Sequence, residues 1–386
     1  MKGGNQVIGK GTYGCVFKPA LNCSNNIESF TTELGKVMFT QSAYKDEANI
    51  SKLLEKADPK GDYLLYPIDK KCQVTKSLVK KHDIADKCMI SKQKDDNFEQ
   101  LIMKDGGQSL SAYIKKLPSK LDRKSLIKLL MNLFHAIYVM VQNNLIHQDI
   151  KVDNVVIDSN NISRLIDFGI TIPSDKLSKS FLLKTEYFLT APEYRVERLR
   201  DPQKIKDIVL NNLKLYCNYD AWSRDGVTIY DDAHVENLLE YYKNYKNNMN
   251  FMNPKTADIY SLGLLIMTLY PFLIPIKLDD PRIVDKFNKL LYDMMTPNPH
   301  ERINIEDLII RAKEIISTPL KKKSPVMKNN SNSPLLPPRP PGTKRPAEMS
   351  PMTRRICPKG KIINPTTGRY VKEDGKIGMM IVGKKC

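Results

Sequence analysis

The chain has 386 residues, of which 61 are basic and 43 acidic, so its formal charge is +18. This length exceeds one small module and suggests about two compact units of roughly 100–200 residues each. With 41% hydrophobic and 8% aromatic residues, the chain can build a core, which excludes wholesale disorder. The charge is uneven, because residues 321–386 hold 16 Lys/Arg against 3 Asp/Glu, whereas residues 1–320 carry only +5.

Seven cysteines are scattered along the chain without a Cys-x-x-Cys pair or a histidine at zinc-ligand spacing. We therefore expect neither a disulfide framework nor a zinc module. The N-terminus lacks an apolar segment of signal-peptide length, and the longest apolar stretch, residues 261–276, is interrupted by Pro271 and Pro275. These features predict a soluble protein of a reducing compartment that does not enter a membrane.

The first hundred residues alternate short apolar runs with turns, a pattern typical of strands. Strands are expected at residues 7–8 and 15–17, on either side of a glycine-rich turn, and at residues 34–39. Residues 44–56 instead have apolar positions at helical spacing.

Beyond residue 109 the pattern becomes helical. Residues 121–143 predict a long apolar helix, and residues 256–270 are so apolar that their helix should be buried on most sides. A β-rich part followed by a helical part predicts an α+β fold.

The composition changes near residue 319. Residues 324–351 contain 8 prolines in 28 positions and few large apolar side chains, so this segment cannot fold alone. It predicts a disordered linker. Its Pro-Pro-Arg-Pro-Pro run could be an SH3-type ligand, although a spacer is the simpler interpretation.

The glycine-rich turn reads Gly-Lys-Gly-Thr-Tyr-Gly-Cys-Val, which fits G-x-G-x-x-G-x-V. Glycines let the backbone approach phosphates closely, and the flanking apolar side chains can cover an adenine. Its position between two strands disfavours a dinucleotide fingerprint, whereas an ordinary hairpin turn remains an alternative. The expected ATP-binding residues here are Ile8, Gly9, Gly11, Gly14 and Val16.

A polar segment, His-Gln-Asp-Ile-Lys-Val-Asp-Asn, ends at Asn154 and is followed by an Asp-Phe-Gly that begins at Asp167. Transfer of a γ-phosphoryl group needs a metal with oxygen ligands, which Asn154 and Asp167 can supply. It also needs a carboxylate to receive the hydroxyl proton and a cation beside the phosphate. Asp149 and Lys151 can fill these roles, two positions apart on one loop.

These residues resemble the eukaryotic-type protein kinase family, and the resemblance covers residues 5–318. It implies a bilobal α+β fold with ATP and Mg²⁺ between a β-rich N-lobe and a helical C-lobe. It also implies that Asp149 and Lys151 are catalytic, whereas Asn154 and Asp167 hold the metal. The expected organisation is a kinase domain at 1–318 (N-lobe 1–104, C-lobe 105–318 with an insertion at 197–254), a linker at 319–355 and a further segment at 356–386.

The family places an ATP-contacting lysine on the third strand. Lys36 lies there, whereas Lys18 is still in the second strand, from which its side chain would not return to the phosphates. Its expected partner is Glu47 on the following helix, because Glu55 comes too late. A plain surface ion pair is the alternative for Lys36 and Glu47.

Other C-lobe motifs extend the resemblance. An Ala-Pro-Glu ending at Glu193 matches A-P-E, Asp258 begins a helix like the one that anchors the catalytic loop, and Arg302 resembles the arginine that pairs with that glutamate. Gln148 stands where many kinases have an arginine that binds an activation-loop phosphate. We therefore expect activity without loop phosphorylation.

The segment after the linker, Ile-Cys-Pro-Lys-Gly-Lys-Ile-Ile-Asn-Pro-Thr-Thr-Gly-Arg-Tyr-Val, resembles the small two-cysteine adaptor module of large double-stranded DNA viruses. Tyr370 replaces the second cysteine of that module, so a paired-thiol role is not predicted. The kinase motifs also look like those of iridovirus-like viruses. This resemblance implies a viral protein of the host cytoplasm, the virion or the nucleus.

The leading hypothesis is a serine/threonine protein kinase that uses ATP and Mg²⁺ on viral or host proteins. Three alternatives stay open. A small-molecule phosphotransferase would share the catalytic loop but not A-P-E, and a pseudokinase scaffold would recruit partners through the tail. The basic tail could also contact nucleic acid, although it lacks regular aromatic interleaving.

Overall fold

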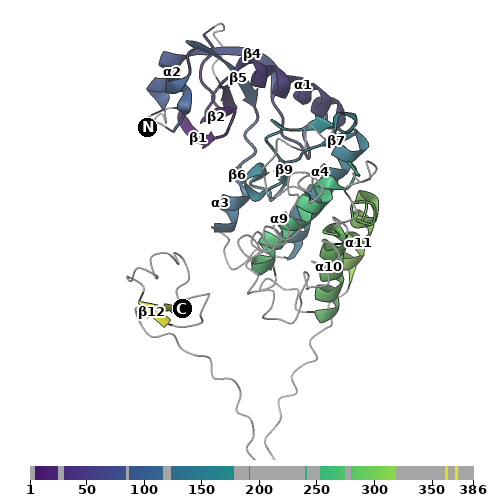
Figure 1. Ribbon diagram of the computed structural model, residues 1–386. Helices are drawn as coiled ribbons and strands as arrows, with labels where there is room; N and C mark the ends of the chain where they lie inside the picture. Colours follow the sequence, from purple (N-terminus) through teal and green to yellow (C-terminus); the bar gives the residue numbers. More distant parts are fainter. Residues whose placement is uncertain are drawn as a thin grey trace, which may run out of the picture. The chain divides into compact units, whose positions relative to one another are not determined.

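The computed structural model describes most of the chain up to residue 318 and two short strands near its C-terminus (Figure 1). The chain divides into two compact units, Met1–Lys322 and Lys323–Cys386. The described residues are 5–24, 30–83, 87–115, 123–177, 191, 240, 253–273, 280–296, 298–318, 361–363 and 370–372.

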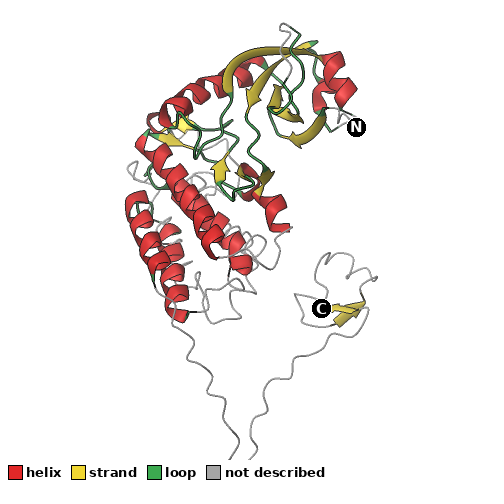
Figure 2. Ribbon diagram, turned by 180° about the vertical axis from the view of Figure 1, so that it is seen from behind, coloured by secondary structure: helices red, strands yellow, loops and turns green. Residues whose placement is uncertain are grey.

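An antiparallel five-stranded sheet forms the N-lobe, with the strand order β1-β2-β3-β5-β4 (Figure 2). Helix α1, Gln41–Ala57, packs against β3, β4 and β5. It begins after Thr40, whose side chain accepts a hydrogen bond from the Ala43 amide and so caps the helix. The strands are β1 Gln6–Lys10, β2 Gly14–Lys18, β3 Leu34–Met38, β4 Ile68–Thr75 and β5 Asn97–Met103.

The register of this sheet sorts its side chains onto two faces. Val16 pairs with Lys36, and Lys36 pairs with Leu101, so these three share one face. Because side chains alternate along a strand, the neighbouring residues Cys15 and Val37 point to the opposite face.

The opposite face is covered by a segment between β4 and β5 that the sequence patterns did not predict as helical. It comprises α2, Lys76–His82, and the 3-10 helix η1, Met89–Lys92. We call the described residues of this segment, 76–83 and 87–92, the cap. Buried cap residues share one hydrophobic cluster with β2, β3, β4 and β5. The members contributed by the cap are Val79, Cys88 and Ile90.

Two disulfides lie in this cluster, Cys15–Cys88 and Cys23–Cys72. The expectation that the cysteines form no disulfide framework is therefore wrong. The partners are 73 and 49 residues apart in sequence. They meet only because the folded sheet and its covering segments bring them together, which spacing along the chain does not reveal.

The C-lobe is mainly helical and carries short strand pairs next to the N-lobe (Figure 1). The sheet β6-β8-β9 and the pair β10-β7 frame the segment that carries Asp149, Asn154 and the Asp-Phe-Gly motif. The described strands of the C-lobe are β6 Gln108–Ser109, β7 Leu145–Ile146, β8 Val155–Ile157, β9 Ser163–Leu165 and β10 Ile172–Pro173. Its helices are α3 Leu110–Lys115, α4 Arg123–Gln142, η2 Val152–Asn154, η3 Ser174–Lys176, α9 Ala257–Leu273, α10 Pro281–Met294 and α11 Ile305–Ser317.

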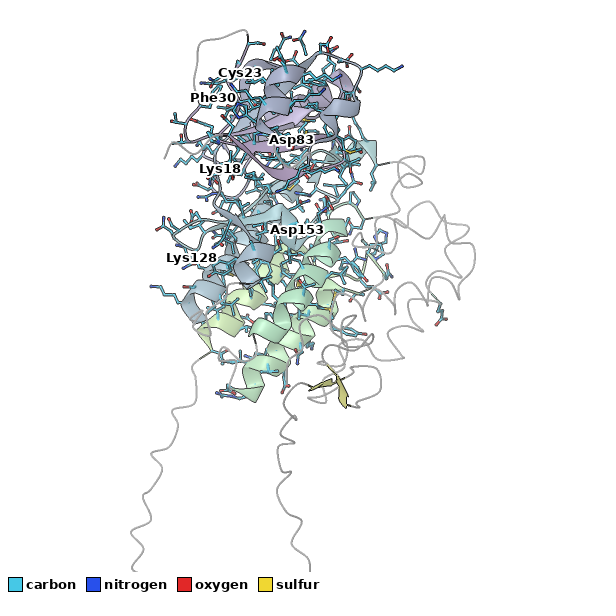
Figure 3. All side chains as sticks on the ribbon, turned by 90° about the vertical axis from the view of Figure 1, so that its left-hand side faces the viewer. Lys18, Cys23, Phe30, Asp83, Lys128 and Asp153 are labelled. Atoms are coloured by element: carbon cyan, nitrogen blue, oxygen red, sulfur yellow. A yellow bond between two sulfur atoms is a disulfide. The ribbon has the colours of Figure 1, made fainter. Side chains whose placement is uncertain are left out.

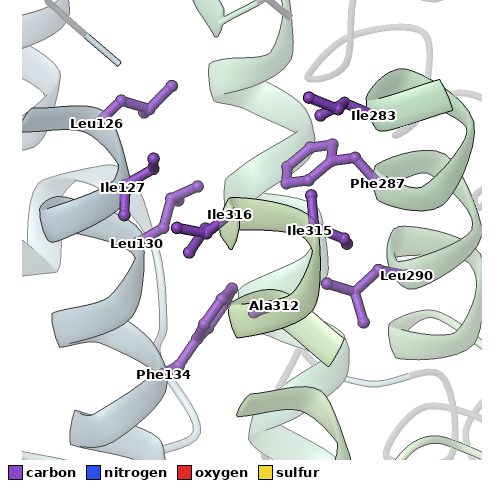
Figure 4. Close-up of a pocket in the computed structure, with 10 residues that line it drawn as sticks. All are labelled: Leu126, Ile127, Leu130, Phe134, Ile283, Phe287, Leu290, Ala312, Ile315 and Ile316. Carbon is purple, nitrogen blue, oxygen red and sulfur yellow. The ribbon is translucent and has the colours of Figure 1, made fainter. Parts of the chain in front are cut away.

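Helix α4 is the centre of the C-lobe core. By length and composition alone it could cross a membrane, but it packs against α11 and β9, and Leu133 and Ile137 on it are fully buried. This is the environment of a core helix. A small apolar cavity of about 50 Å³ remains between α4, α10 and α11 (Figure 4).

This architecture confirms the predicted α+β organisation of a β-rich N-lobe followed by a helical C-lobe. The expected helices 44–56, 121–143 and 256–270 correspond to α1, α4 and α9. Nearly all of the predicted insertion, 197–254, lies outside the described residues. So does the linker, whereas the second unit contains an antiparallel pair, β11 Lys361–Ile363 and β12 Tyr370–Lys372.

Candidate active site

Lys36 on β3 joins the two lobes through a buried network of charges. Its Nζ atom lies 2.9 and 2.8 Å from the two carboxylate oxygens of Glu47 on α1. The same atom donates to Oδ1 of Asp167 at 2.8 Å. Lys36 and Glu47 are 7% and 3% exposed, so they do not form the surface ion pair considered as the alternative. Glu55 is exposed on the same helix.

Burial and neighbouring charges shift the pKa values of the three groups in this network. Burial lowers the pKa of Lys36, but the Glu47 and Asp167 carboxylates outweigh it, so the net pKa is raised. For Asp167, burial raises the pKa, but Lys36 and then His147 and Lys151 bring it below its usual value. Burial raises the pKa of Glu47 despite the attraction of Lys36. The site thus keeps a cation and the Asp167 carboxylate charged at neutral pH.

The catalytic-loop residues contact one another directly. Nζ of Lys151 donates to both carboxylate oxygens of Asp149, at 3.0 and 2.8 Å. Nδ2 of Asn154 donates to Oδ2 and to the backbone carbonyl of Asp149, each at 2.8 Å. Asn154 is buried, and the side chain of Asp149 is 14% exposed. Asp149 is therefore fixed in orientation while its carboxylate remains accessible.

Asp258, at the start of α9, holds the backbone of this loop. Its two carboxylate oxygens accept hydrogen bonds from the amides of His147, at 2.6 Å, and Gln148, at 3.0 Å. The ring of His147 lies 3.2 Å from the Ile166 carbonyl through Nε2 and packs 5.0 Å from the Phe168 ring. These contacts connect the catalytic loop to the Asp-Phe-Gly segment.

Gln148 connects the same loop to the start of the activation segment. Its Nε2 atom donates to the carbonyl of Ile170 at 2.9 Å, and the residue is buried. Both Gln148 and Asp167 adopt positive φ, 68° and 63°. Such backbone angles are uncommon for residues with a side chain and often occur at functional sites.

The three glycines of the glycine-rich turn meet different surroundings. The Gly11 amide donates to the Gly14 carbonyl at 2.8 Å, which closes the turn. A Cβ atom on Gly14 would lie 2.4 Å from the Val37 carbonyl oxygen, whereas one on Gly9 or Gly11 would meet nothing closer than 3.6 Å. Gly14 is therefore required by strand packing, and the other two leave space beside the backbone.

The apolar residues expected around the nucleotide lie on this hairpin. Ile8 on β1 is 52% exposed, and Val16 is half-buried on the same sheet face as Lys36. Lys18, the lysine rejected on spacing, is exposed and bonds Asp105 at 2.5 Å (Figure 3). The hairpin, Lys36 and the Asp-Phe-Gly segment are thus the residues that the fold brings together.

Arg302 lies in a buried position, but its expected partner, Glu193, is outside the described residues. The Arg302 guanidinium donates to the carbonyls of Thr256 and Thr296, each at 3.0 Å, and packs over the Tyr260 ring at 5.1 Å. It therefore supports the turn before α9, which carries Asp258.

Sequence patterns did not predict the hydrogen bonds between the segment after α1 and β9, the strand that precedes the Asp-Phe-Gly motif. After α1, the Leu65 amide donates to the Leu165 carbonyl at 2.9 Å, and the Leu165 amide donates to the Tyr63 carbonyl at 3.0 Å. Arg164 adds a bond from Nε to the Gly61 carbonyl at 3.0 Å. The pairing depends on residues about a hundred positions apart, so no local pattern signals it.

Asn154 and Asp167 fit a magnesium ion that is shared with phosphate oxygens. Asn154 uses Nδ2 for Asp149, so its amide oxygen is the remaining acceptor, and the side chain of Asp167 is 40% exposed. The Ile166 amide donates to the Asn154 carbonyl at 3.0 Å, which ties the two segments together. Magnesium commonly takes one or two such protein oxygens plus water and phosphate. Among the described residues, no group of three or more His, Cys, Asp or Glu could hold a metal alone.

The family model described as protein kinase domain matches residues 72–313, more than half of the chain. The serine/threonine-protein kinase KIC1 of Saccharomyces cerevisiae is 24% identical over 223 residues, covering 56% of this chain and 17% of that protein.

The yeast serine/threonine-protein kinase AKL1 is 31% identical over 114 residues, covering 27% of this chain and 10% of that protein. The chain thus spans less than a fifth of the length of these curated relatives. The family match starts after the glycine-rich turn and Lys36, so it does not include those residues. The chain belongs to the protein kinase domain family.

Proposed function

We propose that the chain transfers the γ-phosphoryl group of ATP to serine and threonine hydroxyls of proteins, with Mg²⁺ as the metal. The observation that carries this proposal is the pair of charge clusters around Lys36 and Asp149. Lys36 bonds both Glu47 and Asp167, and Asp149 bonds both Lys151 and Asn154. Phosphoryl transfer relies mainly on positioning and charge neutralisation, and these clusters offer both.

Each residue has a defined task under this proposal. Asp149 orients the acceptor hydroxyl and takes its proton, and Lys151 balances charge on the moving phosphate. Lys36 binds phosphate oxygens, while Glu47 fixes its ammonium. Asn154 and Asp167 would hold magnesium, whose chemistry is to neutralise the charge that develops on the phosphates.

Preference for serine and threonine over tyrosine rests on two supports. Lys151, two positions after Asp149, is the arrangement that resembles serine/threonine kinases, and it bonds Asp149 through both oxygens. The two yeast relatives are named serine/threonine-protein kinases. The proposed substrates are proteins of a virus or of its host.

Radiolabelled ATP and general protein substrates test this function with the full chain. Wild type should label serine and threonine, and Asp149→Asn should lower turnover by about 100-fold or more while ATP binding stays near wild type. Asp153→Asn is the matched control, because Asp153 is exposed on the same loop (Figure 3). Wild-type turnover in Asp149→Asn would refute the assignment, and ATP binding without any transfer would favour the pseudokinase scaffold.

The tail supports a further proposal about origin and partners. Its resemblance to the viral two-cysteine adaptor favours an iridovirus-like protein of the host cytoplasm, virion or nucleus, with partner proteins recruited through residues 356–386. The local charge of residues 321–386 also permits contact with RNA or DNA. A salt-sensitive shift of DNA by the full chain, lost when residues 323–386 are removed, would distinguish nucleic-acid contact from protein recruitment.

A further inference from the structure

Four of the seven cysteines lie together behind the proposed nucleotide site. Cys15, directly after Gly14, bonds Cys88, and Cys23 bonds Cys72. None of the four is more than 7% exposed. The Cα atoms of the pairs are 5.8 and 5.0 Å apart, inside the range of about 4.4–6.8 Å that a disulfide needs. Their placement suits two closed bonds rather than four reactive thiols.

Two of these cysteines lie in one row across the sheet, Cys15 beside Lys10 of β1 and Cys72 on the last strand, β4. Cys15 on β2 pairs with Val37, Val37 pairs with Gln100, and Gln100 pairs with Cys72 on β4. Opposite residues in antiparallel strands share a face, so the row lies on the face away from Lys36. The row therefore backs the strands that present the glycine-rich turn and Lys36.

The other two cysteines come from the segments that cover this row. Cys88 belongs to the cap, and Cys23 belongs to the connection between β2 and β3, near Phe30 in the upper part of the N-lobe (Figure 3). Phe30 and Leu21 are buried in the same cluster. Each disulfide thus attaches one covering segment to a cysteine of this row.

The Cys15 bond has the closer connection to the nucleotide site. Residues 10–13 of the turn are exposed, and β1 is an edge strand in the described part of the sheet. Hydrogen bonds to β3 and burial of Cys15 and Phe17 hold the hairpin to the lobe. The Cys15–Cys88 bond adds a covalent attachment at the base of this turn, and it also holds the cap against the sheet.

The Cys23 bond is supported by noncovalent contacts. Gln100 donates from Nε2 to the Leu21 carbonyl at 2.8 Å and accepts from the Leu21 amide at 3.0 Å. The Ser24 amide donates to the Gln73 carbonyl at 2.7 Å. These bonds would keep the connection in place after the Cys23–Cys72 bond is cut.

We propose that the disulfides make tight nucleotide binding depend on oxidation of the chain, chiefly through Cys15–Cys88. The inference takes the location of the nucleotide site from the proposed function. Formation would proceed by thiol–disulfide exchange with a disulfide oxidant such as glutathione disulfide. One protein thiolate attacks the oxidant and releases one glutathione, and the second cysteine then displaces the other. The two protein thiols lose two electrons and two protons, which the two released glutathione molecules carry.

The test uses the full chain carrying Cys217→Ser, Cys357→Ser and Cys386→Ser, so that only the four cysteines in question remain. After folding with glutathione disulfide, alkylation in denaturant should modify none of them, and all four after dithiothreitol. Binding of a fluorescent ATP analogue to the folded protein should weaken roughly tenfold on reduction, since the hairpin loses preorganisation. The melting temperature should fall by roughly 5 °C or more.

Two double variants show which of the two disulfides affects nucleotide binding. Cys15→Ala with Cys88→Ala should bind the analogue as weakly as the reduced protein and ignore dithiothreitol, whereas Cys23→Ala with Cys72→Ala should keep most of the affinity. If the first variant fails to fold, the comparison of oxidised with reduced protein decides. Four alkylated thiols before reduction, or equal affinity in both states, would overturn the inference. Asp149→Asn should keep redox-sensitive binding, so an absence of phosphotransfer would count against the proposed function alone.

Discussion

Nζ of Lys36 on β3 lies 2.8 Å from Oδ1 of Asp167, a residue 131 positions later in the chain. The same ammonium bonds Glu47, so one buried cation connects a strand, helix α1 and the Asp-Phe-Gly segment. A buried charge is costly unless it is paired, so the buried groups Lys36 and Glu47 each need the other, and Lys36 also binds the partly exposed Asp167. The arrangement of α1 is therefore coupled to the arrangement of the Asp-Phe-Gly segment.

Lys36→Met should abolish most phosphotransfer, because it removes the cation on the phosphates and leaves Glu47 without its partner. We expect kcat to fall by about 100-fold or more. Lys18→Met is the matched control, since Lys18 is an exposed lysine on the neighbouring strand, paired with Asp105. Steady-state kinetics should show near wild-type kcat for Lys18→Met, and equal losses in both variants would argue against a special role for Lys36.

Two substitutions in the glycine-rich turn should separate folding from nucleotide binding. Gly14→Ala places a Cβ atom 2.4 Å from the Val37 carbonyl oxygen, so it should lower the free energy of unfolding by about 1–3 kcal/mol. Gly11→Ala meets nothing closer than 3.7 Å, so stability should change by less than about 0.5 kcal/mol. Its KM for ATP should still rise, because close backbone approach to phosphate is lost. Denaturation and ATP-dependent kinetics measure the two effects, and equal stability of both variants would contradict this explanation.

Gln148 leads us to expect activity without activation-loop phosphorylation. Its side chain binds the Ile170 carbonyl directly, so the catalytic loop is joined to the activation segment by a neutral hydrogen bond. A neutral amide does not attract a phosphate as an arginine does. Protein treated with phosphatase, and checked by mass spectrometry, should keep most of its turnover. Loss of most turnover after phosphatase treatment, restored by rephosphorylation, would contradict this prediction.

Motifs that are local in the sequence located much of this site. The rise of a strand separates Lys18 from Lys36. The choice of Glu47 over Glu55 rests on the family resemblance, which places the partner ahead of the apolar run at Leu53 and Leu54. The catalytic loop is equally local, since Asp149, Lys151 and Asn154 contact one another within six positions.

Features that depend on strand register could not be predicted from local sequence patterns. The row that contains Cys15, Gln100 and Cys72 exists only once β2, β3, β5 and β4 have paired in one register. Gln100 looks like an ordinary polar residue in sequence, yet it is fully buried and binds Leu21. The cap between β4 and β5 was missed for a related reason, because its apolar residues are too few to show a helical period.

Asp258 offers a test of how α9 positions the catalytic loop. Its carboxylate accepts from the amides of His147 and Gln148, so Asp258→Asn would place an NH₂ donor against one of these amides. The unmade hydrogen bond should cost about 1–3 kcal/mol of unfolding free energy. Because Asp149 follows these two amides directly, kcat should fall by about tenfold, while KM for ATP changes little. Asp285→Asn, at an exposed position on α10, should leave stability and kcat unchanged. Denaturant unfolding and steady-state kinetics decide the matter, and an Asp258→Asn protein with wild-type stability and kcat would show that the loop is held by other contacts.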